Sequence, residues 1–471
     1  SMYRHILANL GFLLQIAGIL TVLPILVGLY LGEIQTLAPL FLTCITFLVC
    51  GFLMNVLCER KDLDFKSSCA LILLSFLIMP LIGAIAYVYN DPFNSQNLAE
   101  RFTNSYFESV SGFTTTGFSF ISDTETLPRS LLIYRSMTEL MGGVGIVFLL
   151  LAFFHSRKSL NHLGNALGID RIGDNLKRIF FSVFIIYSIY IIVFTIIFYI
   201  LGFQGGDIIK TGTFAIDTIT GGYQPPIQFQ QLSIPLRLCI VILMFVGSVN
   251  FAANYHLFAL KLKKVLSKEV ILYLLVIIIG TVLIFFIAGK GTLTSLFHVV
   301  SMSSSTGYDY INIPALNDTA KSIFILLMLL GGCGFSMAGG IKMFRIISFF
   351  KSIKQSVKDI LVKEKVIPEE SKKARENNYY EHFPVLVSIV LFIATLFVFA
   401  IIFSTIGVSF TDAIFEVGSA LTTNGISMGA TNVLMPIAHK WILTVAMIIG
   451  RIEIIPILIA LSPYKRVKKE T

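Results

Sequence analysis

Long apolar runs are the feature that most constrains how this chain can fold. A helix needs about 20 consecutive apolar residues to cross the ~30 Å hydrocarbon core of a bilayer. Ten runs in the 471-residue sequence are long enough: 6–31, 36–57, 68–89, 131–154, 179–202, 234–260, 270–288, 321–341, 384–407 and 438–462. Only 13% of the residues are charged, against about 25% in soluble globular proteins. The sequence therefore predicts an all-α polytopic membrane protein and excludes an ordinary soluble enzyme.

The distribution of basic residues predicts the topology. If the amino terminus lies inside, most of the 36 lysines and arginines fall on the inner side, in segments 58–67, 155–178, 261–269, 342–383 and 463–471. This asymmetry is the positive-inside pattern, which places both termini in the cytoplasm. The net charge of +9 thus reports topology, and we expect no nucleic-acid partner. The six cysteines lie in or beside apolar runs without zinc-binding spacing.

Four segments between the apolar runs are too short and too polar to cross a bilayer. Residues 105–118, 212–223, 296–308 and 414–426 each pass from a semi-apolar stretch into small hydroxylated residues and a glycine. Irregular backbone at membrane depth persists only where protein or a water-filled cavity satisfies it. We therefore expect re-entrant helices followed by loops. Exterior loops with amphipathic ends are the alternative.

Glycine spacing reveals an internal repeat. Counting 25 residues forward from Gly117, Gly222, Gly307 and Gly425 reaches Gly142, Gly247, Gly332 and Gly450. With this glycine content, chance would give all four matches about three times in 100,000. We predict four pseudo-symmetric span, re-entrant loop, span units around one pore, at residues 67–156, 157–262, 263–350 and 382–471. Residues 1–66 add two helices outside the repeat, and 351–381 form a charged cytosolic linker.

The four loops are predicted to form a ring of backbone carbonyls. Glycine can adopt positive φ and lets neighbouring backbones approach, and uncharged carbonyls suit a large monovalent cation. A divalent site would need carboxylates within the loops, whereas Asp123 and Asp309 lie a few residues beyond them and would concentrate cations at the mouth. The candidate filter residues are Thr115, Thr116, Gly117, Thr220, Gly221, Gly222, Ser305, Thr306, Gly307, Thr423, Asn424 and Gly425.

Two features below the loops are candidates for a gate. The eighth apolar run carries too much glycine for a stiff helix, at Gly331, Gly332, Gly334, Gly339 and Gly340 around Ser336. It predicts a flexible loop across the ion path, with close helix packing as the alternative.

Arg451 is the second gate candidate, because it lies near the middle of the last run, where an unpaired charge is costly. We expect it to raise the barrier to cations. A structural ion pair with Glu139, or hydrogen bonds to carbonyl groups of another chain, is the alternative.

The sequence resembles the TrkH/TrkG potassium uptake proteins of the Trk/Ktr/HKT superfamily. The resemblance covers nearly the whole chain, through the four loops and the segments YRSMTELMGGVGI (134–146), VGSVNFAANYHLFAL (246–260), GGCGFSMAGGIK (331–342) and IIGRIE (448–453). It implies potassium uptake, with rubidium accepted and sodium less well, through a single-chain pseudo-tetramer in a prokaryotic cell membrane. Potassium would bind the filter carbonyls, the 331–342 loop would be the gate, and no cofactor is implied. The resemblance also implies a homodimer and a cytosolic ring of nucleotide-binding subunits of the TrkA type.

The chain departs from potassium channels two residues beyond each loop glycine. Channels repeat glycine there, but this chain has Ser119, Gln224, Asp309 and Ser427. Fewer stacked carbonyl rings predict weaker discrimination of potassium from sodium. Two other functions remain open. One is a proton- or sodium-coupled potassium symporter of the same fold. The other, more remote, is an intramembrane enzyme, against which no HExxH occurs and the segment 334–339 around Ser336 lacks the GxSxG spacing of a serine hydrolase.

Overall fold

The computed structural model describes residues 2–61, 63–153, 176–361 and 369–463, and every regular element in these ranges is helical. The amino-terminal pair is α1 (Met2–Leu31) and α2 (Ile34–Leu57). The first unit holds α3 (Phe65–Gly83), α4 (Ile85–Asn90), α5 (Leu98–Phe113) and α6 (Arg129–Phe153). The second holds α8 (Leu176–Ile200), η1 (Phe203–Gly206), α9 (Ile208–Thr220), η2 (Phe229–Gln231), α10 (Ile234–Ser248), α11 (Phe251–Phe258) and α12 (Leu262–Val265). The third holds α13 (Lys268–Ala288), α14 (Thr292–Ser303), η3 (Ile313–Ala315), α15 (Asp318–Leu330) and α16 (Met343–Leu361). The fourth holds α17 (Glu369–Ser404), α18 (Phe410–Leu421), α19 (Ile437–Ile452) and α20 (Ile454–Leu461).

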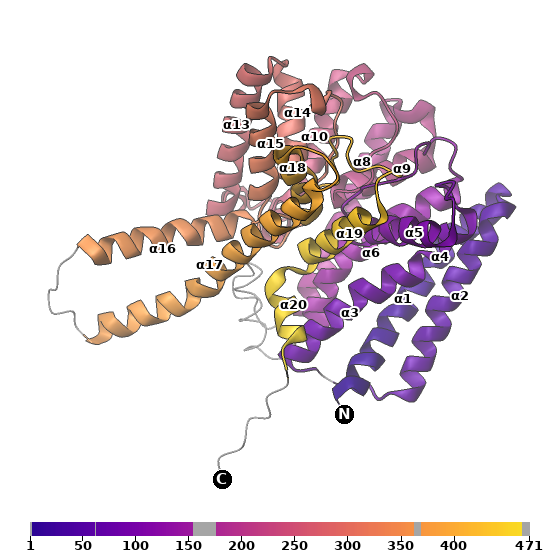
Figure 1. Ribbon diagram of the computed structural model, residues 1–471, viewed down its shortest axis with the longest axis horizontal. Coiled ribbons are helices and arrows are strands. Elements are labelled where there is room, and N and C mark those ends of the chain that lie inside the picture. Colours follow the sequence, from indigo (N-terminus) through magenta and orange to yellow (C-terminus); the bar gives the residue numbers. More distant parts are fainter. Residues whose placement is uncertain (1, 62, 154–175, 362–368, 464–471) are drawn as a thin grey trace, which may run out of the picture.

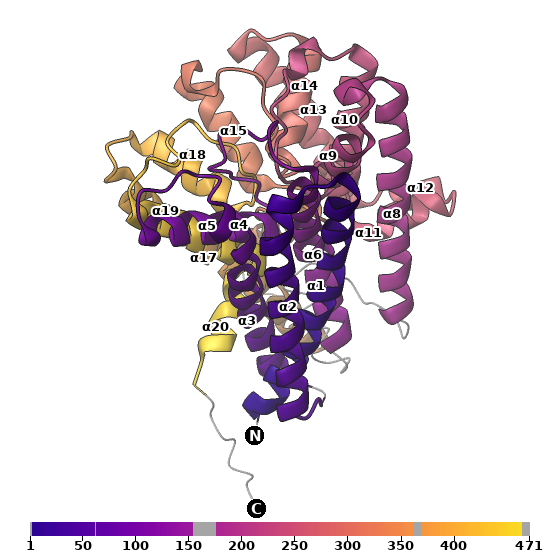
Figure 2. The same ribbon diagram turned by 90° about the vertical axis from the view of Figure 1, so that its right-hand side faces the viewer.

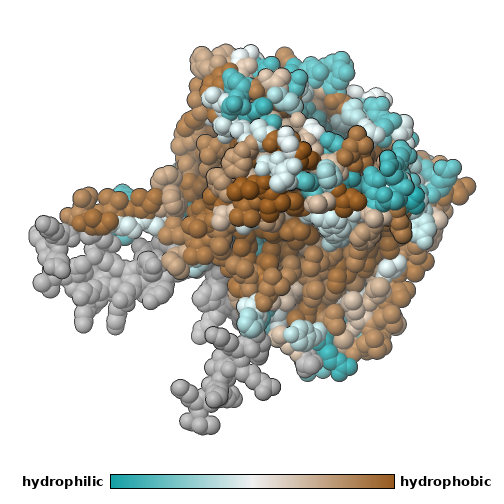
Figure 3. All heavy atoms as spheres, viewed as in Figure 1, coloured by the Kyte–Doolittle hydropathy of each residue, from teal (hydrophilic) through white to brown (hydrophobic). Residues whose placement is uncertain are grey.

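Membrane-length helices form the body of the molecule (Figures 1 and 2). Within the described ranges, six helical stretches are long and apolar enough to cross a bilayer, namely Met2–Leu31, Ile34–Leu57, Phe65–Asn90, Ser182–Ile200, Lys268–Ala288 and Phe383–Ser404. Hydrophobic residues cover the middle of the face in Figure 3, and hydrophilic residues gather toward its upper edge. The prediction of an all-α polytopic membrane protein is confirmed. The predicted boundary at 156–157 and linker residues 362–368 lie outside the described residues.

Four short helices, α5, α9, α14 and α18, precede the four glycine loops. They have 16, 13, 12 and 12 residues, too few to cross a bilayer. Their loop-proximal halves are buried among the longer helices, as in α5, where every residue from Thr103 to Phe113 is buried. This burial excludes the alternative of exterior loops. We call these elements the loop helices, and residues 114–118, 221–223, 304–308 and 422–426 the first to fourth loops.

The glycines 25 residues beyond the loop glycines allow close helix packing. A Cβ on Gly142, Gly247 or Gly450 would lie 1.6, 2.4 or 2.2 Å from a backbone carbonyl oxygen at the end of the loop helix in the same unit, respectively Phe113, Ile219 and Leu421. The fourth, Gly332, instead faces Ser248 O at 2.8 Å, because the chain has left its helix at Gly331 (φ 68°). Three of the four paired glycines therefore share one packing role.

Two predicted spans are bent rather than straight. Run 234–260 forms α10 and α11, which meet at 118°, and run 438–462 forms α19 and α20, which meet at 97°. The first bend is stabilised by Asn250, whose side chain accepts a hydrogen bond from Ala253 N and caps α11. At the second bend Glu453 has φ 74°. The apolar runs predicted one span at each place and did not indicate either bend.

The amino-terminal pair is joined to the first unit at its loop-side end. Glu33, in the turn between α1 and α2, accepts hydrogen bonds from Arg129 N and Ser130 N, both at 2.9 Å. These amides begin α6, so Glu33 caps a helix nearly one hundred residues away in sequence.

A helical hairpin of α16 and the first half of α17 projects from the body (Figure 1). One side of α16 leaves Phe350, Ile353, Val357, Ile360 and Leu361 exposed. We call these five residues the α16 apolar face. Such a contiguous apolar surface indicates a contact with lipid or protein.

Candidate ion pathway

Left-handed backbone marks all four loops. Gly117, Gly307 and Gly425 have φ of 86°, 73° and 80°, and the residues two positions earlier, Thr115, Ser305 and Thr423, are also left-handed. The second loop differs, because its left-handed residue is Gly221 (φ 79°) and Gly222 lies outside this region. The expectation of positive φ at Gly222 is therefore wrong. Gly222 is required for another reason, since a Cβ there would lie 1.8 Å from Glu139 Oε1.

The four loops touch one another in cyclic order. A methyl group added to one glycine of each loop would collide with a carbonyl oxygen of the next loop. These contacts are Gly117 with Gly222 O (2.4 Å), Gly221 with Ser305 O (2.7 Å), Gly307 with Asn424 O (1.9 Å) and Gly425 with Thr116 O (1.9 Å). The fourth loop thus closes onto the first. Eleven of the twelve predicted filter residues lie in this closed ring of loops, and Thr220 is the last residue of α9.

Several oxygens of this ring have no hydrogen-bond partner in the part of the chain that the structure describes. The hydroxyls of Thr115 and Thr423 and the amide oxygen of Asn424 are buried without a hydrogen-bond partner among the described residues. Buried polar atoms are normally paired, so these oxygens are available to a ligand. No group of three or more His, Cys, Asp or Glu that could hold a metal ion occurs among the described residues, and the loops themselves carry no carboxylate.

The residues two positions beyond the loop glycines fix the loops, which sequence reasoning missed. Ser119 Oγ donates to Glu108 at 2.7 Å, and Ser427 Oγ donates to Glu416 at 2.9 Å. Gln224 Nε2 donates to Asp309 O at 2.8 Å, and Asp309 N donates to Gln224 Oε1 at 3.1 Å. The first and fourth loops are therefore tied to their own loop helices, and the second and third are tied to each other.

The glycine-rich segment 331–342 is outside any helix and lies against the loops. Its backbone is bonded to the end of α10, with Cys333 N donating to Ser248 O (2.9 Å) and Met337 N to Gly247 O (3.1 Å). Gly339 N donates to Ser305 Oγ in the third loop at 2.8 Å. A Cβ on Gly339 would lie 2.2 Å from Thr422 O in the fourth loop. The segment thus contacts two loops directly, and continuous helix packing is excluded.

Arg451 joins three units. It is 8% exposed, and its guanidinium donates to Gly143 O at 3.1 Å, with longer bonds to Gly142 O (3.5 Å) and Met337 O (3.4 Å). Glu139, the ion-pair partner considered from sequence, instead accepts from Tyr223 N. Arg451 therefore connects α19 to α6 and to segment 331–342 through backbone carbonyls.

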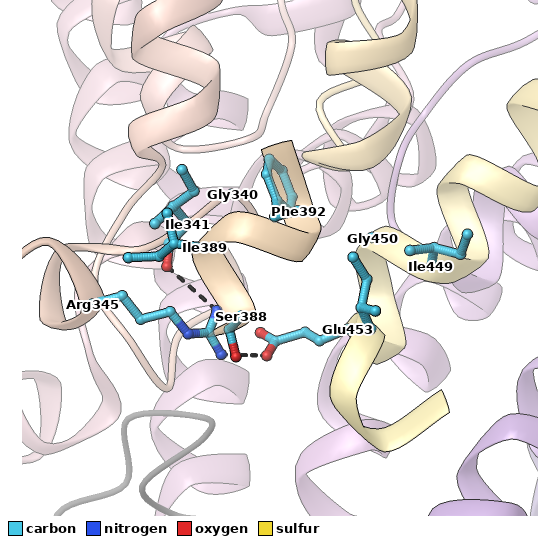
Figure 4. A pocket seen from close by; sticks show the side chains of 10 residues that line it. Gly340, Ile341, Arg345, Ser388, Ile389, Phe392, Ile449, Gly450 and Glu453 are labelled. Carbon is cyan, nitrogen blue, oxygen red and sulfur yellow. Dashed lines mark hydrogen bonds and ion pairs between the residues drawn. The ribbon is translucent and has the colours of Figure 1, made fainter. Parts of the chain in front are cut away.

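An ion-pair cluster lies where segment 331–342 ends. Glu453 pairs with Arg345 and, at 3.5 Å, with Lys342. Arg345 and Glu453 line a pocket between α16, α17 and the α19–α20 bend, and Figure 4 shows the two side chains pointing toward each other across it. The ion pairs connect the fourth unit to the segment of the third unit, and sequence spacing alone did not indicate them.

The helices and loops define a class of protein, namely polytopic membrane proteins in which four pseudo-symmetric units surround one central path. The TrkH family, described as cation transport protein, matches residues 88–205 and 225–469. The chain belongs to this family, which confirms the resemblance noted from the sequence.

Individual relatives agree with the family assignment. An uncharacterized cation transporter of Methanocaldococcus jannaschii is 28% identical over 96% of this chain and 94% of its own. The Trk system potassium uptake proteins TrkI of Halomonas elongata and TrkH of Escherichia coli K12 are 27% and 24% identical, over 77% and 86% of this chain and 77% and 87% of theirs. The crystal structure of the potassium transporter TrkH from Vibrio parahaemolyticus has a TM-score of 0.81 at 21% identity, over 98% of this chain and 99% of that one. That likeness supports the fold.

Proposed function

We propose that this chain carries potassium into the cell through a pore whose selectivity filter is the ring of four loops. The observation that carries the proposal is the closed cycle of loop contacts, whose uncharged side-chain oxygens at Thr115, Thr423 and Asn424 have no hydrogen-bond partner among the described residues. Such oxygens replace the hydration shell of a monovalent cation. The names of relatives in the Trk system point to the same ion. We propose no enzymatic activity and no cofactor.

Segment 331–342 and Arg451 are proposed to form the gate. The segment contacts the third and fourth loops, and Arg451 holds it to α6 through Met337 O and Gly143 O. A fixed positive charge beside the path opposes a dehydrated cation. In this proposal, movement of segment 331–342 removes both the segment and the positive charge of Arg451 from the ion path.

The assembly is proposed to be a homodimer in the cell membrane of a prokaryote, with both termini in the cytoplasm. The projecting α16–α17 hairpin supplies an exposed apolar face suited to a second copy. The charged linker 351–381 is proposed to dock a nucleotide-binding regulatory subunit of the TrkA type.

Growth rescue tests the proposed function. The chain should restore growth at low potassium to a bacterial strain that lacks its own potassium uptake systems. Gly117→Ser, which crowds the Gly222 carbonyl, should impair this rescue and admit relatively more sodium. Expressed protein that fails to rescue growth contradicts the proposal.

Rubidium uptake into vesicles separates a passive pore from a coupled symporter. Uptake should follow the rubidium gradient and persist when the proton and sodium gradients are abolished. Loss of uptake without one of those gradients favours the symporter.

A further inference from the structure

The first and fourth loops are held by buried carboxylates at equivalent places. Glu108 lies nine residues before Gly117, and Glu416 lies nine residues before Gly425; both are fully buried. Three residues beyond each glycine, Phe120 N donates to Glu108 Oε2 at 3.1 Å, and Met428 N donates to Glu416 Oε1 at 2.7 Å. Each loop helix therefore binds the backbone amide on the far side of its own loop.

The third loop uses a neutral histidine at this place. His298 lies nine residues before Gly307 and is fully buried. Its Nδ1 lies 2.7 Å from Thr294 O, and its Nε2 lies 3.1 Å from Tyr310 N. A carbonyl oxygen only accepts and an amide only donates, so these partners assign the proton to Nδ1 and make Nε2 the acceptor.

The second loop takes its acceptor from another unit. Thr213, nine residues before Gly222, donates its hydroxyl to Lys210 O instead. Glu139 on α6 serves this loop instead, at an amide one residue beyond the glycine rather than three. Its Oε1 accepts from Tyr223 N at 2.8 Å, and its Oε2 accepts from Thr220 Oγ1 at 3.3 Å. Glu139 is fully buried. In all four loops a buried side chain thus accepts a hydrogen bond from a backbone amide just beyond the glycine. In three loops the acceptor lies on the loop's own helix, and in the second it lies on α6.

We infer that Glu108, Glu139, His298 and Glu416 are positioning residues that set the ion selectivity of the loops. An unpaired buried amide is costly, so each acceptor selects the loop conformation that keeps its bond. The loop conformation fixes where the carbonyl oxygens lie, and the size and flexibility of that cavity determine discrimination among monovalent cations. The inference rests on the proposed function.

Selectivity measured in proteoliposomes tests the inference at His298. The full-length protein is reconstituted, and ⁸⁶Rb⁺ uptake is measured in competition with K⁺ and with Na⁺. His298→Leu removes the acceptor at similar volume and should lower the preference for K⁺ over Na⁺ by on the order of tenfold. His298→Gln, which supplies a neutral oxygen acceptor, should recover most of the preference.

Matched variants separate positioning from general stability. Ser295→Ala removes another buried polar group from α14, whose hydroxyl bonds Lys290 O rather than the loop, and should keep the wild-type preference. If His298→Leu does not fold, Glu416→Gln replaces it. That change retains one oxygen acceptor, places a donor among the hydroxyls of Ser427 and Thr431, and should lower the preference several-fold.

If a folded His298→Leu or Glu416→Gln protein keeps the wild-type preference for K⁺ over Na⁺, the inference is wrong, but the proposed function is unaffected. Wild-type vesicles that take up no Rb⁺ contradict the proposed function and the inference with it.

Discussion

Gly142 allows α6 to pack closely against the end of α5, and a single added methyl group would prevent this contact. A Cβ there would lie 1.6 Å from Phe113 O, which is backbone and cannot rotate away. Gly142→Ala should therefore lower the free energy of unfolding by about 3 kcal/mol or prevent folding. Thermal unfolding of the purified protein in detergent measures the effect.

Gly145 supplies the control for this prediction, because it lies on the same helix and no atom of the described residues lies within 4 Å of its added Cβ. Gly145→Ala should match or slightly exceed wild-type stability, since alanine favours helix by up to about 1 kcal/mol. Equal stability of the two variants would contradict the packing role.

Arg451 is the residue whose charge the gate proposal needs. Arg451→Ala should raise Rb⁺ uptake several-fold, because it removes the positive charge and the bonds that hold segment 331–342. Arg451→Gln keeps amide donors for the carbonyls but loses the charge. If Gln behaves as Ala, charge is the barrier, whereas unchanged or lower uptake in both folded variants rules against Arg451 as a barrier.

Asp309 gives the pathway a pH dependence at the residue scale. Burial raises the pKa of its carboxyl to about 6, so the group is charged at pH 7.5 and neutral at pH 5. Because the charged form concentrates cations at the loops, uptake should fall about two- to threefold as external pH drops through 6. Asp309→Asn should have low uptake at both pH values, while Asp123→Asn, an exposed acid, should keep the wild-type profile. A pH profile unchanged by Asp309→Asn would refute this role.

The backbone conformation of a loop glycine could be predicted from sequence only in the loops that have the same geometry. Gly117, Gly307 and Gly425 have the expected left-handed backbone, since identical spacing implies identical geometry. In the second loop the left-handed residue is Gly221 instead, and Gly222 is required because a Cβ there would collide with Glu139 Oε1. The contact between Glu139, in the first unit, and the second loop cannot be predicted from the spacing of residues within that loop.

At the scale of the element, the sequence indicates where helices occur better than how they bend. The runs 234–260 and 438–462 read as single spans, yet each contains a sharp bend. Hydropathy measures how apolar a segment is, and two apolar helices joined by a bend have the same hydropathy as one straight helix. The interruption at 331–342 was predictable, because there glycine itself replaces helix-forming residues.

Glu33 links the amino-terminal helix pair, which lies outside the fourfold repeat, to α6 of the first unit. Glu33→Ala should lower the free energy of unfolding by about 1–2 kcal/mol, because Arg129 N and Ser130 N at the start of α6 lose their acceptor. Thermal unfolding in detergent provides the measurement. Glu125→Ala, a change at an exposed acid, should have no effect. If both variants unfold at the wild-type temperature, the cap contributes nothing to stability.

At the scale of the whole molecule, the projecting hairpin predicts an assembly. A charge on the α16 apolar face should disrupt a dimer, so Ile353→Glu should shift the purified protein from dimer to monomer in light scattering. The neighbouring Lys354→Glu, outside that face, should remain dimeric. A dimer that persists in Ile353→Glu and in Val357→Glu places the interface elsewhere.

The unequal supports of the four loops have a consequence for how such a protein can change over time. In a ring of four identical chains, one codon alters every quarter at once. Here the supports are Glu108, Glu139, His298 and Glu416, each encoded separately. A single substitution therefore changes one loop while the other three stay intact. Ion preference can thus change in small steps, each of which leaves a protein that still conducts ions.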